Sequence, residues 1–226
     1  NTMPAFKSGI EVGADWLELD MFLTKDGKLV VTHDKTTGRV GDQNLDVAQS
    51  TYAELQAVDV ATDFRKRHQL TQEECPPQQM PLLEEVLKLV RQQHRTRVSL
   101  QPKADCVKQA VALVKQLNME PWVGFNDGNL TYMSQVKQLA PEIPVFWDRG
   151  AETDLDADIK IAKQRGFEAL VLHFQGVTPE KIRKIKAAGL EPGAWTVNDP
   201  QLMKQLLQQG LERIYTDEPR LLLKLK

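Results

Sequence analysis

Short apolar stretches alternate with longer helical patterns along almost the whole chain. The short stretches are rich in apolar and β-branched residues, which is typical of strands, and each except the first is followed by a helix or a helical turn. The first continues into a hairpin. This order indicates repeated βα units around a parallel sheet. The predicted strands span residues 15–24, 97–103, 121–126, 144–149, 169–174, 191–197 and 213–217.

A helix is predicted over residues 3–12, ahead of the first of these strands. Asn1 or Thr2 suits its N-cap, and Pro4 falls in its first turn. In a ring of eight βα units this helix would follow a strand of its own, immediately upstream of Asn1. Seven strands alone would leave open parallel edges. We therefore predict an α/β fold, a TIM-type (βα)8 barrel, whose first strand is missing from the sequence.

Residues 35–80 break the alternation of strands and helices. They are polar and too many for a plain loop. We expect residues 1–226 to form a single barrel domain, with residues 35–80 as a small subdomain inserted after the strand that ends at His33, over the mouth of the barrel.

Composition and charge exclude several classes of protein. Of the 226 residues, 41% are hydrophobic and 27% are charged, which is ordinary for a globular protein and unlike a disordered chain. The 29 Lys and Arg residues against 31 Asp and Glu residues lack the basic excess of a nucleic-acid-binding protein. The apolar stretches fall far short of the roughly 20 residues of a membrane-spanning helix. We expect neither nucleic acid as a partner nor a membrane span.

The two cysteines, Cys75 and Cys106, lack metal-binding spacing. They fit free thiols in a reducing compartment, so we expect a cytoplasmic protein. A single disulfide bridge in a secreted protein is the alternative.

The first predicted strand carries two acidic residues on one face. Period-two alternation places Glu18 and Asp20 together with Trp16 and Phe22, and places apolar side chains on the opposite face. Two carboxylates between aromatic neighbours repel one another unless a cation lies between them, and a hard divalent cation meets that need. The alternative is an amphipathic strand whose carboxylates lie in water.

A histidine returns toward these carboxylates. Asp26-Gly27 predicts a tight hairpin turn, after which the chain runs back to His33 at the end of the returning strand. An imidazole there can exchange protons near neutral pH. The alternative is a histidine that only caps the strand.

Two aromatic residues near strand ends are candidates for substrate contact. Trp195 lies near the carboxyl end of its strand, where barrel enzymes build their active sites, and Phe125 is a weaker candidate of the same kind. The alternative for Trp195 is ordinary core packing.

Several motifs follow one another along nearly the whole chain. They are Asn1-Thr2-x-x-Ala5-Phe6, Gly13-Ala14-Asp15-x-Leu17-Glu18-Leu19-Asp20, Thr24-Lys25-Asp26-Gly27, Val30-Val31-x-His33-Asp34, Met80-Pro81-Leu82-Leu83-Glu84-Glu85-Val86, Lys103, Gly189, Trp195-Thr196-Val197-Asn198 and Thr216-Asp217-x-Pro219. In this order and spacing they resemble the glycerophosphodiester phosphodiesterase family.

The resemblance implies a TIM-type barrel that hydrolyses glycerophosphodiesters, its small-molecule substrates, to glycerol 3-phosphate and an alcohol, as part of lipid and glycerol metabolism. By the family pattern, Glu18 and Asp20 bind one divalent cation, Mg²⁺ or Ca²⁺. His33 is one of two acid/base histidines, and the other belongs to a His-Arg pair on the strand expected upstream of Asn1. Trp195 lines the substrate pocket.

The strand over residues 97–103 departs from the family pattern at one position. Its odd positions face the barrel interior, so Gln101 and Lys103 point toward Glu18 and Asp20. Lys103 suits a phosphate oxygen. Gln101 stands where the family usually has a third metal-binding Glu; its amide oxygen can still bind Mg²⁺ or Ca²⁺, with one negative charge fewer. The alternative for Gln101 is a hydrogen-bonding residue without a metal.

The sequence therefore predicts a metal-dependent phosphodiester hydrolase whose catalytic residues are His33 and Lys103. Lys103, Trp195 and Phe125 are predicted to bind substrate, and Glu18, Asp20 and Gln101 to bind the metal. Two other functions fit the same residues. One is a binding protein on a catalytically weakened barrel, and the other is a phospholipase D-like lyase that acts on lysophospholipids.

Overall fold

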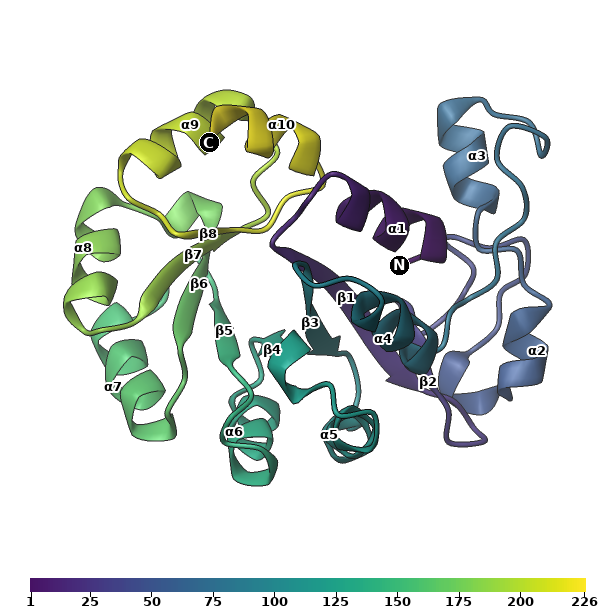
Figure 1. Ribbon diagram of the computed structural model, residues 1–226, viewed down its shortest axis with the longest axis horizontal. Helices are drawn as coiled ribbons and strands as arrows, with labels where there is room; N and C mark the ends of the chain where they lie inside the picture. The colour runs from purple at the N-terminus through teal and green to yellow at the C-terminus, as the bar shows by residue number, and fades with distance from the viewer. The chain divides into compact units, whose positions relative to one another are not determined.

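The computed structural model describes residues 1–226, which divide into two compact units, Asn1–Trp122 and Val123–Lys226 (Figure 1). No helix in either unit has the length and apolar character needed to cross a membrane. The prediction of one barrel domain, with residues 35–80 as an inserted subdomain, stays a prediction.

The first unit contains a sheet in the order β2-β1-β3. The hairpin predicted at Asp26-Gly27 joins β1 to antiparallel β2, and Gly27 adopts a positive φ of 74°, which glycine allows at no steric cost. β3 pairs with β1 in parallel. The elements are α1 (Met3–Glu11), β1 (Trp16–Leu23), β2 (Leu29–Val31), η1 (Val47–Gln49), α2 (Tyr52–Gln56), α3 (Thr62–His68), α4 (Leu83–Arg91), β3 (Arg97–Pro102), α5 (Val107–Gln116) and η2 (Glu120–Trp122).

The two faces of β1 follow the predicted alternation. Leu17, Leu19 and Met21 are buried on one face. On the other face the parallel register places Glu18 opposite Ser99 and Asp20 opposite Gln101. Because paired residues of neighbouring strands point to the same side of a sheet, these polar residues of β1 and β3 share a face.

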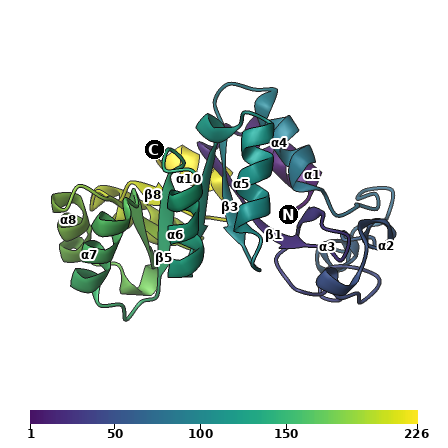
Figure 2. The same ribbon diagram turned by 90° about the horizontal axis from the view of Figure 1, so that it is seen from below.

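The segment between β2 and α4 has a small core of its own. Val47, Leu55 and Met80 are buried and pack against Phe22 and Val30 of the β1–β2 hairpin. Both ribbon views show α2 and α3 at one side of the first unit (Figures 1 and 2). The hairpin therefore supports this segment through apolar contacts.

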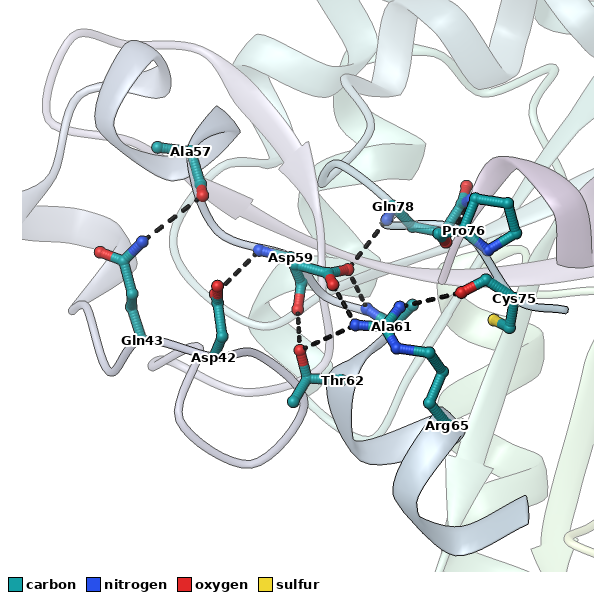
Figure 3. A network of polar contacts seen from close by, with 10 residues as sticks. All are labelled: Asp42, Gln43, Ala57, Asp59, Ala61, Thr62, Arg65, Cys75, Pro76 and Gln78. Atoms are coloured by element: carbon teal, nitrogen blue, oxygen red, sulfur yellow. Dashed lines mark hydrogen bonds and ion pairs between the residues drawn. The ribbon is translucent and has the colours of Figure 1, made fainter. Parts of the chain in front are cut away.

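A buried ion pair between Asp59 and Arg65 closes the same segment (Figure 3). Asp59 also accepts hydrogen bonds from the backbone N–H groups of Ala61 and Gln78, and Arg65 donates to the carbonyl of Cys75. Burial acts to raise the pKa of Asp59, but the hydrogen bonds from Arg65 and the two backbone groups outweigh it, so the pKa lies below its usual value. The pair ties the start of α3 to the chain that returns toward α4.

The second unit is a parallel sheet in which consecutive strands are neighbours, from β4 to β8. α6 packs on β4 and β5, α7 on β6, and α8 on β7. Figure 1 shows these helices along one side of the strands. The elements are β4 (Val123–Asp127), α6 (Leu130–Leu139), β5 (Val145–Arg149), α7 (Leu155–Arg165), β6 (Ala169–His173), η3 (Phe174–Gly176), α8 (Pro179–Ala187), β7 (Glu191–Trp195), α9 (Pro200–Gln208), β8 (Arg213–Ile214) and α10 (Pro219–Leu225).

Local signals set the helix ends in this unit. The Thr178 side chain accepts a hydrogen bond from the N–H of Lys181 and caps α8, and the Asp199 side chain caps α9 through the N–H of Leu202. Gly189, with φ of 78°, follows the end of α8. Every predicted strand is present, although β8 is shorter than predicted and residues 121–122 belong to η2.

Candidate active site

A cluster of polar side chains lies on one face of the first unit's sheet, around Asp20. Asp20 is only 4% exposed. The Asn1 side chain donates from Nδ2 to Asp20 Oδ2 at 2.8 Å, and the Asp20 backbone N–H donates to Asn1 Oδ1 at 3.1 Å. Lys103 Nζ lies 3.0 Å from Asp20 Oδ1 and donates to Gln101 Oε1 at 2.7 Å. One ammonium group therefore neutralises the buried carboxylate and also holds the neighbouring amide.

Strand register explains why these side chains meet. Asp20 of β1 and Gln101 of β3 are register partners, and the N–H of Lys103 donates to the carbonyl of Met21 at 3.0 Å, just beyond β3. Lys103 thus follows Gln101 by two residues along an extended backbone and points to the same side. The structure brings together Asp20, Gln101 and Lys103, as the alternation predicts.

Glu18 lies on the same face, two residues before Asp20, and is half-buried. Its register partner is Ser99. Together, Glu18, Asp20 and Gln101 offer two carboxylates and one amide oxygen, the hard donors that Mg²⁺ and Ca²⁺ prefer. No three His, Cys, Asp or Glu side chains of the chain group into a metal site. The donor chemistry fits an oxygen-binding divalent cation, with Gln101 as the uncharged member.

His33 lies two residues beyond the end of β2, and its side chain is 56% exposed. Its Nδ1 is 2.6 Å from Asp34 Oδ1, and Arg39 Nε is 2.5 Å from the other oxygen of that carboxylate. The hydrogen bonds from Arg39 and His33 hold the pKa of Asp34 at about 2, well below its ordinary value. The imidazole therefore has a partner that is ionised at neutral pH on one ring nitrogen, and half of its side chain is exposed to solvent.

The second unit places the two predicted aromatic residues on opposite faces of its sheet. Trp195 ends β7, and its ring meets the ring of His173 edge-on, with centroids 4.9 Å apart. Its indole Nε1 is buried and has no hydrogen-bond partner. Strand register from β4 to β7 puts Asn126 on the face of Trp195 and Phe125 on the other.

Phe125 has no exposed surface. Its role in substrate binding stays a prediction that the structure does not favour, because a side chain enclosed on the opposite face offers no surface to a ligand beside Trp195. The alternation of the strand carried this information: Asn126, the next residue, has the other orientation.

Sequence reasoning missed three residues that contact the site. Asn1 suits a helix N-cap, but its side chain binds Asp20, while Thr2 precedes α1 without a side-chain cap. Asp34 and Arg39 contact His33 directly or through one another. The only signal in the sequence for Asp34 was its position next to His33. Arg39 lies in a polar stretch where no pattern in the sequence distinguishes it from its neighbours.

The chain is similar in sequence to known proteins over nearly its whole length. The model of the glycerophosphoryl diester phosphodiesterase family matches residues 1–221. A protein named glycerophosphodiester phosphodiesterase from Caldanaerobacter subterraneus subsp. tengcongensis is 28% identical over 100% of this chain and 91% of its own length. The chain belongs to the glycerophosphoryl diester phosphodiesterase family.

Solved structures show the fold. A phosphodiesterase from Oleispira antarctica, in complex with the product sn-glycerol-3-phosphate, matches with a TM-score of 0.85 at 23% identity, over 100% of this chain and 90% of its own. A glycerophosphodiester phosphodiesterase from Parabacteroides distasonis matches with a TM-score of 0.81 at 24% identity, over 99% and 90% of the two chains. The prediction of a TIM-type α/β barrel is confirmed.

Proposed function

We propose that this chain hydrolyses glycerophosphodiesters to glycerol 3-phosphate and an alcohol, with one divalent cation, Mg²⁺ or Ca²⁺. Membership of the family supports the reaction class, and the glycerol 3-phosphate bound to the Oleispira antarctica relative supports the product. The observation that carries the proposal is the convergence of Asp20, Gln101 and Lys103 on one face of the β1–β3 pair.

The cation would be held by Glu18, Asp20 and Gln101. When bound, it supplies Lewis-acid stabilisation of the negative charge on phosphoryl oxygens. Gln101 contributes no charge, so the site holds two carboxylates where the family pattern implies three. We expect a correspondingly lower affinity for the metal.

Lys103 supplies a second positive charge. Its side chain is 22% exposed, so the ammonium reaches the surface of the cluster while Asp20 stays beneath it. A phosphodiester is an anion, and negative charge grows on its oxygens as the nucleophile attacks. A flexible ammonium already beside Asp20 can donate to such an oxygen and lower the barrier.

His33 would move the proton. With Nδ1 directed to Asp34, the other ring nitrogen, Nε2, is the atom that takes a proton from the attacking hydroxyl or gives one to the leaving alkoxide. Trp195 is proposed as a substrate contact at the carboxyl end of β7, where its buried indole N–H has no acceptor within the protein.

The test is product analysis on the purified protein with glycerophosphocholine and glycerophosphoethanolamine. We expect release of glycerol 3-phosphate that EDTA abolishes and Mg²⁺ or Ca²⁺ restores. Asp20→Asn should abolish turnover, while Asp156→Asn, a matched change at an exposed carboxylate of α7, should not.

Two other outcomes separate the alternatives. Substrate binding by equilibrium dialysis without product release would favour a weakened barrel that acts as a binding protein. A cyclic phosphate formed from lysophosphatidylcholine, without hydrolysis of the glycerophosphodiesters, would favour the lyase. Either result contradicts the proposed hydrolase.

A further inference from the structure

His33 belongs to a chain of three charged or ionisable side chains. Its Nδ1 lies 2.6 Å from Asp34 Oδ1, and the second oxygen, Oδ2, lies 2.5 Å from Nε of Arg39. Each oxygen of Asp34 therefore has its own partner, one on each side. Family membership and the donor set around Asp20 assign no role to Asp34 or Arg39.

The ionisation of Asp34 decides which ring nitrogen of His33 carries a proton. Hydrogen bonds from Arg39 and His33 lower the pKa of Asp34 to about 2, so the group is a carboxylate throughout the working pH range. An ionised carboxylate only accepts hydrogen bonds. A contact of 2.6 Å to Nδ1 therefore requires the hydrogen to be on Nδ1, which leaves Nε2 of the neutral imidazole as the acceptor.

Arg39 stands on a firmly held turn. Thr37 has no exposed surface, its hydroxyl donates to the carbonyl of Gln43 at 2.6 Å, and the N–H groups of Val40 and Gly41 donate to its carbonyl. The carbonyl of Val40 in turn accepts from the N–H of Asp63 at the start of α3. The backbone that carries Arg39 is thus held by hydrogen bonds on both sides of it.

The carboxylates around Arg39 raise its pKa. Its pKa is raised first by the hydrogen bond to Asp34, and the charges of Asp63 and Asp20 add to this effect. The charged form of Arg39 is therefore stabilised both by Asp34, the partner of His33, and by Asp20, the buried carboxylate of the cluster.

We propose that Asp34 and Arg39 are positioning residues that hold the His33 ring with its proton on Nδ1, so that Nε2 is free to exchange a proton with the substrate. Asp34 acts on the ring directly, and Arg39 acts by fixing Asp34 in place. The proposal deepens the proposed function and, in its catalytic consequence, depends on it. The tautomer and orientation of the ring do not depend on it, because they are properties of the protein without substrate.

The chain offers a matched control for Arg39. Arg67 and Asp63 form another Arg–Asp contact, with Nε 2.7 Å from Oδ2 and side chains 63% and 30% exposed, against 58% and 29% for Arg39 and Asp34. This second pair has no histidine on the carboxylate. Arg67→Gln therefore removes an equivalent surface Arg–Asp contact while leaving Asp34 and its contacts with His33 and Arg39 in place.

The first experiment measures the ¹⁵N chemical shifts of the two ring nitrogens of His33 by NMR, in protein labelled with ¹⁵N-histidine. The pH is set high enough for the imidazole to be neutral. His33→Gln identifies the signals. We expect the native Nδ1 to show the shift of a protonated nitrogen and Nε2 that of a bare one. Asp34→Asn, whose amide can itself donate to Nδ1, should move the population toward the Nε2-protonated form, and Arg39→Gln should do so in part. Arg67→Gln should change nothing.

The second experiment separates kcat from KM with glycerophosphocholine. Asp34→Asn should lower kcat by about 100-fold, and Arg39→Gln by about 10-fold, with KM changed less than about 3-fold, because the ring is misdirected while substrate contacts remain. Asp34→Glu should recover part of the loss. Thermal denaturation verifies that each variant is folded.

Unchanged ring signals in Asp34→Asn would overturn the proposal, as would an equal effect of Arg39→Gln and Arg67→Gln on the tautomer. A native protein that releases no glycerol 3-phosphate, yet shows the Nδ1-protonated ring and its loss in Asp34→Asn, would contradict the proposed function and support the positioning pair. The two failures therefore give different results.

Discussion

The first unit contains two buried acid–base pairs of opposite design. Asp59 is paired with Arg65 and also accepts two backbone hydrogen bonds, and Arg65 donates to the carbonyl of Cys75 as well. Asp20 is paired with Lys103 and is otherwise held by the side chain of Asn1. The first pair joins two segments of chain (Figure 3), and in the second the Lys103 side chain is 22% exposed.

The basic residue of each pair, Arg65 in one and Lys103 in the other, explains this difference in design. A guanidinium is planar and presents several donors in fixed directions, so Arg65 can saturate a carboxylate and a carbonyl together. An ammonium is a compact charge on a flexible stem, which can turn from Asp20 to another oxygen without unfolding anything. The comparison indicates that a saturated pair serves stability, whereas a pair with a movable cation and side-chain partners is suited to binding an anion.

The largest expected effect is on activity. Asp20→Asn removes the charge that orients Lys103 and contributes to the proposed metal site, so kcat/KM should fall by at least about 100-fold. The melting temperature should change little, because the amide can still exchange hydrogen bonds with Asn1. Steady-state kinetics and thermal denaturation measure the two quantities. Loss of less than half of the activity would show that the Asp20 pair is structural after all.

The corresponding change in the other ion pair is Asp59→Asn. It leaves the buried guanidinium of Arg65 without a counter-charge, so the melting temperature should fall by about 5 °C or more. Activity per folded molecule should stay within about 2-fold of the native value. A folded, thermostable variant with low activity would reverse the roles that the comparison assigns to the two pairs.

A smaller effect is expected from Gln101→Glu. A third carboxylate beside Asp20 adds negative charge to the proposed cation site, so affinity for Mg²⁺ or Ca²⁺ should rise about 10-fold. Calorimetric titration of the metal into protein without substrate measures this. Gln116→Glu, at the exposed end of α5, is the matched control. Equal affinity in the native protein and Gln101→Glu would contradict the placement of the cation.

The smallest effect concerns acid stability. Asp34 has a pKa of about 2 in the folded protein against an ordinary 3.8, so below pH 3.8 the unfolded chain binds the extra proton more readily. Its contribution to the free energy of unfolding is therefore complete above about pH 4 and is lost between about pH 4 and pH 2. Urea unfolding at several pH values should show the native protein and Asp34→Asn converging across that window. Parallel curves would show that Asp34 makes no such contribution.

Much of the fold could be predicted from local patterns. Apolar runs marked every strand, and capping residues such as Thr178 and Asp199 marked helix starts, because both depend on neighbours within a few residues. The alternation in β1 placed Glu18 and Asp20 on one face for the same reason. Alternation also put Phe125 and Asn126 on opposite faces, but it could not tell which of the two faces meets a ligand.

The sequence by itself determined the parallel βα framework, which follows from the alternation of short apolar runs with helical patterns. It also determined the two faces of β1 and the grouping of Gln101 with Lys103, since both follow from a period of two along one strand. Only the tertiary structure decided that Asn1 binds Asp20, that Arg39 holds the partner of His33, and that Asp59 pairs with Arg65. The first contact joins residues 19 positions apart, and the other two join residues five and six positions apart across backbone that is at least partly irregular, so their geometry depends on how loops of several residues close. No periodic pattern encodes that closure, because a loop's path is set by the packing it meets at both ends.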